Sequence, residues 1–123
     1  MTKAERATIA HAIAQAEDGT NGRIAVRIIP DRSIDPLERA KREFTALKLH
    51  QYEHRNGALI LIAVNARRFA IVGDRALHER VGDEFWNAVV NESQPFFARG
   101  DSQAGILYAI ARIGEALRTH FAE

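Results

Sequence analysis

NGALILIAV, residues 56–64, is the most informative stretch of this chain. The turn-forming pair Asn-Gly leads into an apolar run, Ala58–Val64, that no polar residue interrupts and that is partly β-branched. A run of this length, bounded by turn residues, predicts a strand that is buried on both faces of a sheet. Helices on both sides of that strand would supply the cover, which indicates an α/β protein.

The neighbouring segments supply the rest of the expected sheet. RFAIVG, residues 68–73, follows after the short turn Asn65-Ala66-Arg67 and predicts an antiparallel hairpin with the first strand. Upstream, apolar residues at 24, 26 and 28 alternate with Ala25 and Arg27, which predicts a third strand that ends at Pro30.

Four segments have helical patterns. Residues 3–17 follow a Thr2–Glu5 capping box, and Asp35-Pro36 opens a second helix. Residues 83–92 predict a third helix, which Pro95 should break, and Gly100-Asp101-Ser102 should cap a long final helix. The resulting order of elements, α-β-α-β-β-α-α, predicts a three-layer α/β/α sandwich around a small mixed sheet.

Helical spacing also predicts which side chains are buried. The second helix should bury one stripe. In the pairs Phe85-Trp86 and Phe96-Phe97, adjacent side chains point in different directions, so one of each pair should be buried and the other partly exposed. The predicted stripe is Leu37, Ala40, Phe44 and Leu47; the predicted core aromatics are Phe85 and Phe96, and the partly exposed ones are Trp86 or Phe97.

Composition narrows the class of protein. The 123 residues are 46% apolar and carry a net charge of +1, which suits one globular domain over residues 1–123 and gives no basic excess for nucleic acid. The absence of cysteine excludes thiolate metal sites, disulfides and a Cys nucleophile. With no apolar run near the roughly 20 residues that span a bilayer and no signal-peptide pattern, we expect a cytoplasmic protein without direct membrane insertion.

The segment 74–84 after the last strand is acidic. Asp74, Glu79 and Asp83 are candidate ligands for a hard cation such as Ca²⁺ or Mg²⁺, because carboxylates on a loop can wrap such an ion. The alternative is that Asp83 caps the following helix while the other two pair with Arg75 and Arg80. Nothing in the sequence indicates an organic cofactor.

A second motif has weaker support. His50-Gln51-Tyr52-Glu53-His54 fits the H-x-x-E-H zinc-protease pattern, which needs both histidines on one face of a helix. Such proteases need a third ligand and larger domains, so a solvated helix end is the simpler interpretation.

Taken in order, several motifs resemble those of the TPM domain family. They are Asn56-Gly57-Ala58-Leu59, then Arg68 to Gly73, and finally Pro95 to Asp101 with Gly105-Ile106. The resemblance covers nearly the whole chain and implies a Rossmann-like α/β/α sandwich. It also implies a link to acid phosphatases or to binding of divalent cations, which are described for some members. In the family's acidic loop Asp83 matches the downstream Asp, and Glu79 or His78 takes the place of the motif Glu.

The resemblance leaves two function hypotheses. The first is a non-catalytic accessory module that binds a protein partner and holds a cation in segment 74–84. For such a module the family implies a membrane-anchored relative or a LemA-type protein as partner. The second is a metal-assisted acid phosphatase with Asp83 and Glu79 as ligands and His78 as general acid. Gly22-Arg23-Ile24 lacks the Glu that the family often has there, which removes one carboxylate from the second hypothesis.

Overall fold

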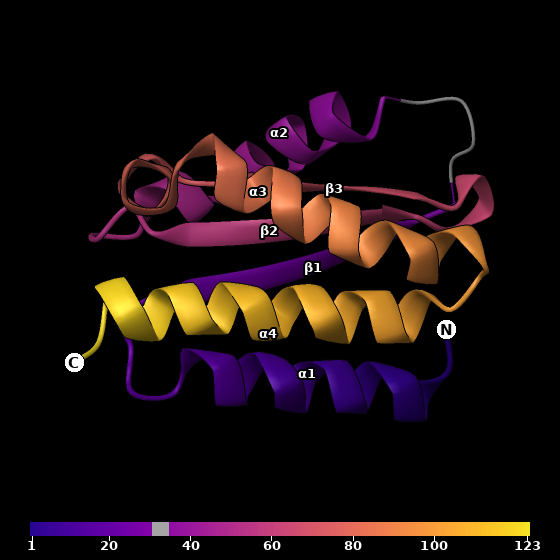
Figure 1. The fold of residues 1–123 in the computed structure, drawn as a ribbon, viewed down its shortest axis with the longest axis horizontal. Coiled ribbons are helices and arrows are strands. Elements are labelled where there is room, and N and C mark those ends of the chain that lie inside the picture. Colours follow the sequence, from indigo (N-terminus) through magenta and orange to yellow (C-terminus); the bar gives the residue numbers. More distant parts are fainter. Residues whose placement is uncertain (31–34) are drawn as a thin grey trace.

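A mixed sheet organises the computed structural model, which describes residues 1–30 and 35–123 (Figure 1). Its central strand, β2 (Gly57–Ala63), runs parallel to β1 (Arg23–Ile29) and antiparallel to β3 (Arg68–Gly73). All seven residues of β2 are buried. The predicted doubly covered strand and its hairpin are therefore confirmed.

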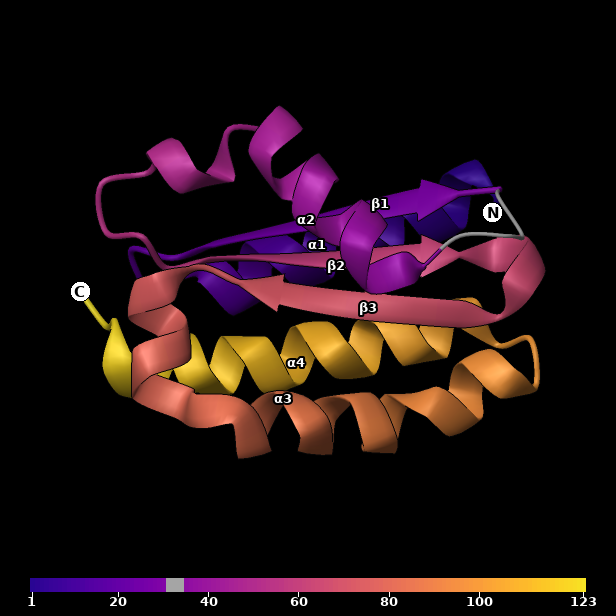
Figure 2. The ribbon, with the colours of Figure 1, turned by 90° about the horizontal axis from the view of Figure 1, so that it is seen from above.

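Helices cover both faces of this sheet. The helix α2 (Pro36–Ala46) lies on one face, and α1 (Lys3–Glu17), α3 (Arg75–Ala98) and α4 (Ser102–His120) lie on the other (Figure 2). Because side chains alternate along a strand, Ile60 packs toward the three helices and Leu61 toward α2. The three-layer α/β/α sandwich is confirmed. Two single turns of 3₁₀ helix, η1 (Leu49–Gln51) and η2 (Val64–Ala66), lie in the connections.

The predicted helix starts are satisfied by side-chain caps. The Thr2 hydroxyl accepts from the Glu5 N–H at 3.1 Å, and the Asp35 carboxylate accepts from the Leu37 N–H at 3.0 Å. Asp101 caps α4 in the same way. Among the helices of residues 1–30 and 35–123, none is both long enough and apolar enough to cross a membrane.

The third helix is longer than predicted on both sides. A first part begins at Arg75 and ends at the non-helical Gly82, and a second part starts at residue 83, as predicted, and continues through Pro95 to Ala98. Asp74 caps the new start and fully buried Leu77 anchors the first turn, so the expected loop is helical. Gly82 has a φ of +77°, which favours glycine and separates the two parts of the helix. The prediction that Pro95 ends the helix is wrong.

The predicted buried stripe of α2 is also partly wrong. Leu37 is 45% exposed and Leu47 is 42% exposed, whereas Pro36, Ala40 and Phe44 face the sheet. The buried set repeats every four residues and begins one residue earlier than predicted. The sheet meets α2 on this slightly rotated face, which leaves Leu37 at the edge of the interface.

The aromatic pair before α4 is reversed. Phe97 is 1% exposed and stacks on Phe69 with ring centroids 4.2 Å apart. Phe96 is only half-buried and lies against Tyr108 and Arg99. Because the helix bends at Gly82 and continues across Pro95, it turns Phe97 toward the sheet and Phe96 away from it. The spacing of apolar residues did not predict this rotation of the helix.

The H-x-x-E-H segment does not form a metal-binding helix. The helix α2 ends at Ala46, and Lys48 has left-handed backbone angles with φ +60°. His50 lies in the η1 turn, and His54 follows in a turn outside it. The two histidines therefore do not share a helical face, in agreement with the simpler interpretation.

Candidate functional site

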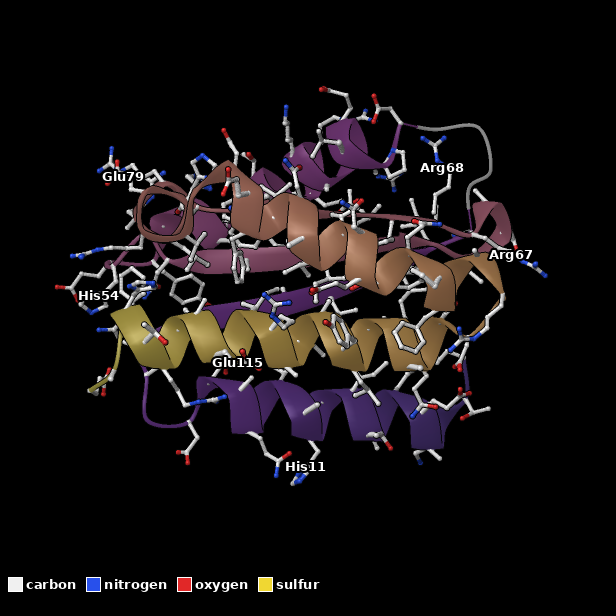
Figure 3. The ribbon with its side chains drawn as sticks, in the orientation of Figure 1. His11, His54, Arg67, Arg68, Glu79 and Glu115 are labelled. Carbon is white, nitrogen blue, oxygen red and sulfur yellow. The ribbon has the colours of Figure 1, made fainter. Side chains whose placement is uncertain are left out.

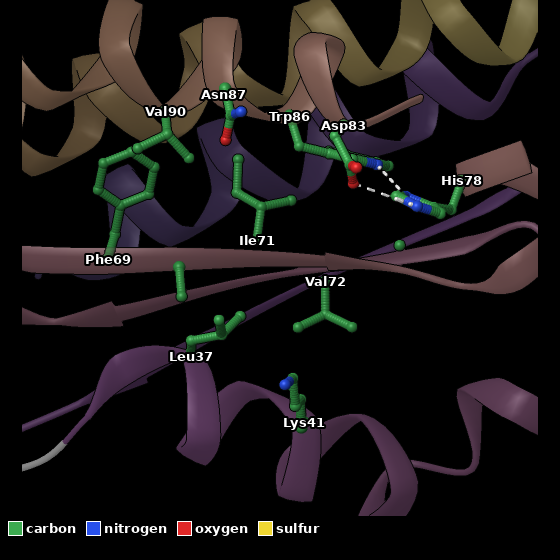
Figure 4. Close-up of a pocket in the computed structure, with 12 residues that line it drawn as sticks. Leu37, Lys41, Phe69, Ile71, Val72, His78, Asp83, Trp86, Asn87 and Val90 are labelled. Atoms are coloured by element: carbon green, nitrogen blue, oxygen red, sulfur yellow. Dashed lines mark hydrogen bonds and ion pairs between the residues drawn. The ribbon is translucent and has the colours of Figure 1, made fainter. Parts of the chain in front are cut away.

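A groove runs along the free side of β3 (Figure 4). It encloses about 560 Å³ between α2 and α3, whose side chains form two facing walls. Most of its lining is aliphatic or aromatic. The lining residues are Leu37 and Lys41 from α2, Phe69 to Gly73 from β3, and His78, Asp83, Trp86, Asn87 and Val90 from α3.

A hydrogen-bonded group fixes one end of the α3 wall. The Trp86 indole N–H donates to Nδ1 of His78 at 3.0 Å, and Nε2 of the same imidazole lies 3.4 Å from Oδ1 of Asp83. The indole also packs directly on β3, since a Cβ at Gly73 would lie 2.4 Å from its Cζ2 atom. Both ring nitrogens of His78 are thus engaged within the protein, and the small residue at 73 is what lets Trp86 approach the strand.

The carboxylate of Asp74 has a structural role, because all of its hydrogen bonds described here are made within the protein. Its two carboxylate oxygens accept from Arg55 Nε at 2.7 Å and Arg55 Nη2 at 2.9 Å, and Oδ1 also accepts from the Arg75 N–H at 2.7 Å. Burial raises the pKa of this carboxyl, but the hydrogen bonds and positive charge of Arg55 and the N–H of Arg75 outweigh it. The pKa of Asp74 therefore lies below its ordinary value. The ion pair joins the start of α3 to the residue that precedes Asn56.

The three predicted cation ligands do not converge. Asp74 is bonded to Arg55, whereas Asp83 is on the solvent side of the groove with its side chain 87% exposed. Glu79 lies on the outside of the molecule, at the end opposite Arg68 (Figure 3). Within residues 1–30 and 35–123, no three His, Cys, Asp or Glu side chains gather closely enough to hold a metal ion. As arranged here, these residues do not fit the cation site that the sequence suggested.

Arg55 is the partner that the sequence analysis missed, although the hairpin holds the signal for it. With Ala63 opposite Arg68, the register places Ala58 opposite Gly73. The residues just before β2 and just after β3 must then meet at one end of the sheet, where Asp74 N–H donates to the Gly57 carbonyl at 2.8 Å. Counting along the predicted hairpin places Asp74 opposite Gly57 and Arg55 opposite Ala76, which brings the long Arg55 side chain within reach of Asp74.

The groove itself had no signal in the sequence. Trp86 was noted only as a partly exposed aromatic residue, and Leu37 was assigned to the core. Their relation depends on α2 and α3 lying on opposite faces of the same edge strand, which local spacing does not specify.

Comparison with known proteins gives a family and three similar folds. The family model described as TPM domain matches residues 1–116. The NMR structure of BA42 protein from Bizionia argentinensis is 34% identical, with a TM-score of 0.89, over 99% of this chain and 84% of that one.

Two solution NMR structures at 16% identity share the fold. The N-terminal domain of cg2496 protein from Corynebacterium glutamicum has a TM-score of 0.74 and covers 95% of this chain and 74% of its own. The N-terminal domain of a protein from P. gingivalis has a TM-score of 0.75, and the match covers 100% of this chain and 82% of that one. No curated protein matches the chain.

Proposed function

This chain belongs to the TPM domain family, and from that premise we propose that it is a non-catalytic accessory module that binds a protein partner. The observation that carries the proposal is the apolar groove between α2 and α3. Leu37 stands in its wall with nearly half of its surface exposed, and Trp86, hydrogen-bonded to His78, stands on the facing wall. An apolar surface of this kind is typical of a binding site. The cytoplasmic location expected from the sequence stays a prediction.

The family suggests which partners to test first. A membrane-anchored member of the same family and a LemA-type protein are the candidates that the sequence motifs imply. We expect the soluble domain of one of them to bind this protein and to shift the backbone amide NMR signals of residues 69–73. Titration of ¹⁵N-labelled protein with each domain measures both the affinity and the surface involved. A titration in which neither domain binds, in a protein with measurable turnover, would contradict the proposal.

The alternative, a metal-assisted acid phosphatase, places demands that the described residues do not meet. Its cation needs several converging oxygens, and the predicted ligands lie apart. Its general acid needs a ring nitrogen free to reach the substrate, and both nitrogens of His78 have partners within the protein. Binding of Ca²⁺ or Mg²⁺ by segment 74–84 stays a prediction from the sequence.

We therefore expect no cation-dependent turnover. Chelator-stripped protein should hydrolyse p-nitrophenyl phosphate at the rate of buffer alone, with or without millimolar Mg²⁺ or Ca²⁺. Calorimetric titration with the same ions measures binding separately from turnover. Saturable binding and turnover that are both lost in Asp83→Ala would establish the alternative function in place of the accessory role.

A further inference from the structure

We infer that the free edge of β3 takes an extended peptide segment of a partner protein as an additional strand, with acidic side chains on its α2 side and apolar side chains on its α3 side. This inference rests on the proposed function and gives it a binding mode. Strand addition combines main-chain hydrogen bonds with pockets for alternate side chains.

The backbone of β3 has hydrogen-bonding groups free on its outer side. Asp74 N–H donates to the carbonyl of Gly57, the residue opposite it in the register. In an antiparallel pair such residues alternate, so Val72 and Ala70 also turn their N–H and C=O toward β2. The intervening residues, Phe69, Ile71 and Gly73, turn these groups away from the sheet.

No described residue satisfies those outer groups. The order of the sheet is β1-β2-β3, and β3 pairs with β2 alone among the described strands. Edge strands in proteins are usually protected by a proline, an inward-pointing charge or a bulge. The segment FAIVG, residues 69–73, has none of these residues, which is the pattern of an edge that pairs with another chain.

The two walls of the groove favour a single strand over a second copy of the protein. Leu37 and Lys41 flank the edge on one side, and Trp86 and Val90 flank it on the other (Figure 4). One extended chain fits between such walls. A second copy would bring its own α2 and α3 into the same space, because the edge of its sheet has identical walls.

Charge sets the chemistry of the expected segment. Arg68 is exposed at the start of β3, on the same side of the strand as Val72, and its side chain forms no ion pair or hydrogen bond with the described residues. Lys41 stands on the α2 wall, and within residues 1–30 and 35–123 its ammonium group forms an ion pair with the exposed Glu38 alone, at 3.6 Å. Carboxylates of an added strand would meet these two cations. On the α3 side the strand would meet the indole of Trp86 and the aliphatic Val90.

Hydrogen exchange tests the edge in the free protein and in the complex. The amides of Ala70 and Val72 should already be protected in the free protein, whereas those of Phe69, Ile71 and Gly73 should exchange freely. Binding should slow these three amides by about tenfold or more, because each one gains a hydrogen bond to the added strand.

The probe is a phage-displayed library of linear 12-residue peptides, selected on the intact protein. We expect enriched peptides to alternate apolar and other residues, to carry carboxylates, and to bind Leu37→Asp about tenfold or more weakly. Leu47→Asp is the matched control, since Leu47 is similarly exposed but lies outside the groove. Lys41→Glu and Arg42→Glu form a second pair, of which only Lys41 lines the groove.

Each outcome of these experiments decides the inference. Enriched peptides that protect the three outer amides and lose affinity only in the groove variants support it. A peptide or partner domain that binds without protecting these amides overturns strand addition and leaves the accessory function standing. Protection that appears at high protein concentration without peptide, together with dimer formation, assigns the edge to a second copy instead. If neither the selected peptides nor the partner domains bind the protein, the inference and the proposed function are both overturned.

Discussion

Asp74→Ala is expected to lower the free energy of unfolding by about 2–3 kcal/mol at neutral pH. The carboxylate is 6% exposed, accepts two hydrogen bonds from Arg55 and caps α3 through the Arg75 N–H. Its removal leaves a guanidinium without its partner and a helix without its cap. Chemical denaturation monitored by the fluorescence of Trp86, the single tryptophan, measures the loss.

The stabilisation that the Asp74 carboxylate provides should depend on pH, and the direction of this dependence follows from its pKa. The pKa of Asp74 is lowered in the folded protein, so its ionised form is favoured by folding. The stabilisation is fully present above the pKa of the unfolded chain, about 3.9 for an aspartic acid, and is lost as the pH falls through the lower folded value. The difference between the wild-type protein and Asp74→Asn should therefore be constant near neutral pH and shrink below about pH 4.

Asp83→Ala is the matched control for Asp74. Its carboxylate is on α3 but largely exposed, and its contact with the His78 imidazole is open to solvent. The stability of this variant should stay within about 0.5 kcal/mol of the wild-type protein. Equal losses in the two variants would mean that Asp74 does not join α3 to the start of β2.

The sheet could be predicted because its signals are local. NGALILIAV is apolar on both sides of the strand, and RFAIVG follows after too few residues for any connection but a hairpin. The caps at Thr2, Asp35 and Asp101 are local for the same reason, since each side chain bonds to a backbone N–H within three residues. The three-layer arrangement then follows, because a strand that is buried on both faces needs helices on both faces of the sheet.

Rotation of the helices could not be predicted in the same way. Leu37 and Phe96 have the spacing of buried residues, but the neighbouring residues Pro36 and Phe97 are the ones that are buried. Which of two adjacent faces is buried depends on how the helix lies across the sheet. The candidate groove exists because of this rotation, since it leaves Leu37 beside the free edge of β3.

Phe97→Ala is expected to cost about 3–5 kcal/mol of stability, the range typical of a buried aromatic residue truncated to alanine. The ring stacks on Phe69 of the edge strand and fills the space beside α4, where a Cβ at Gly105 would lie 2.8 Å from its Cε2 atom. A cavity there would separate β3 from the two helices that support it. Equilibrium unfolding in urea measures the loss.

Phe96→Ala is the decisive comparison for that prediction. The two phenylalanines are adjacent in sequence, but Phe96 is only half-buried, against the partly exposed Tyr108 and the Arg99 guanidinium. Its truncation should cost about 1 kcal/mol. Because Phe97→Ala could leave too little folded protein to measure, Phe97→Leu provides a milder test, with an expected loss of about 1.5 kcal/mol. A larger loss at Phe96 than at Phe97 in these variants would restore the sequence-based assignment and contradict the continuous helix across Pro95, since only that rotation directs Phe97 into the core.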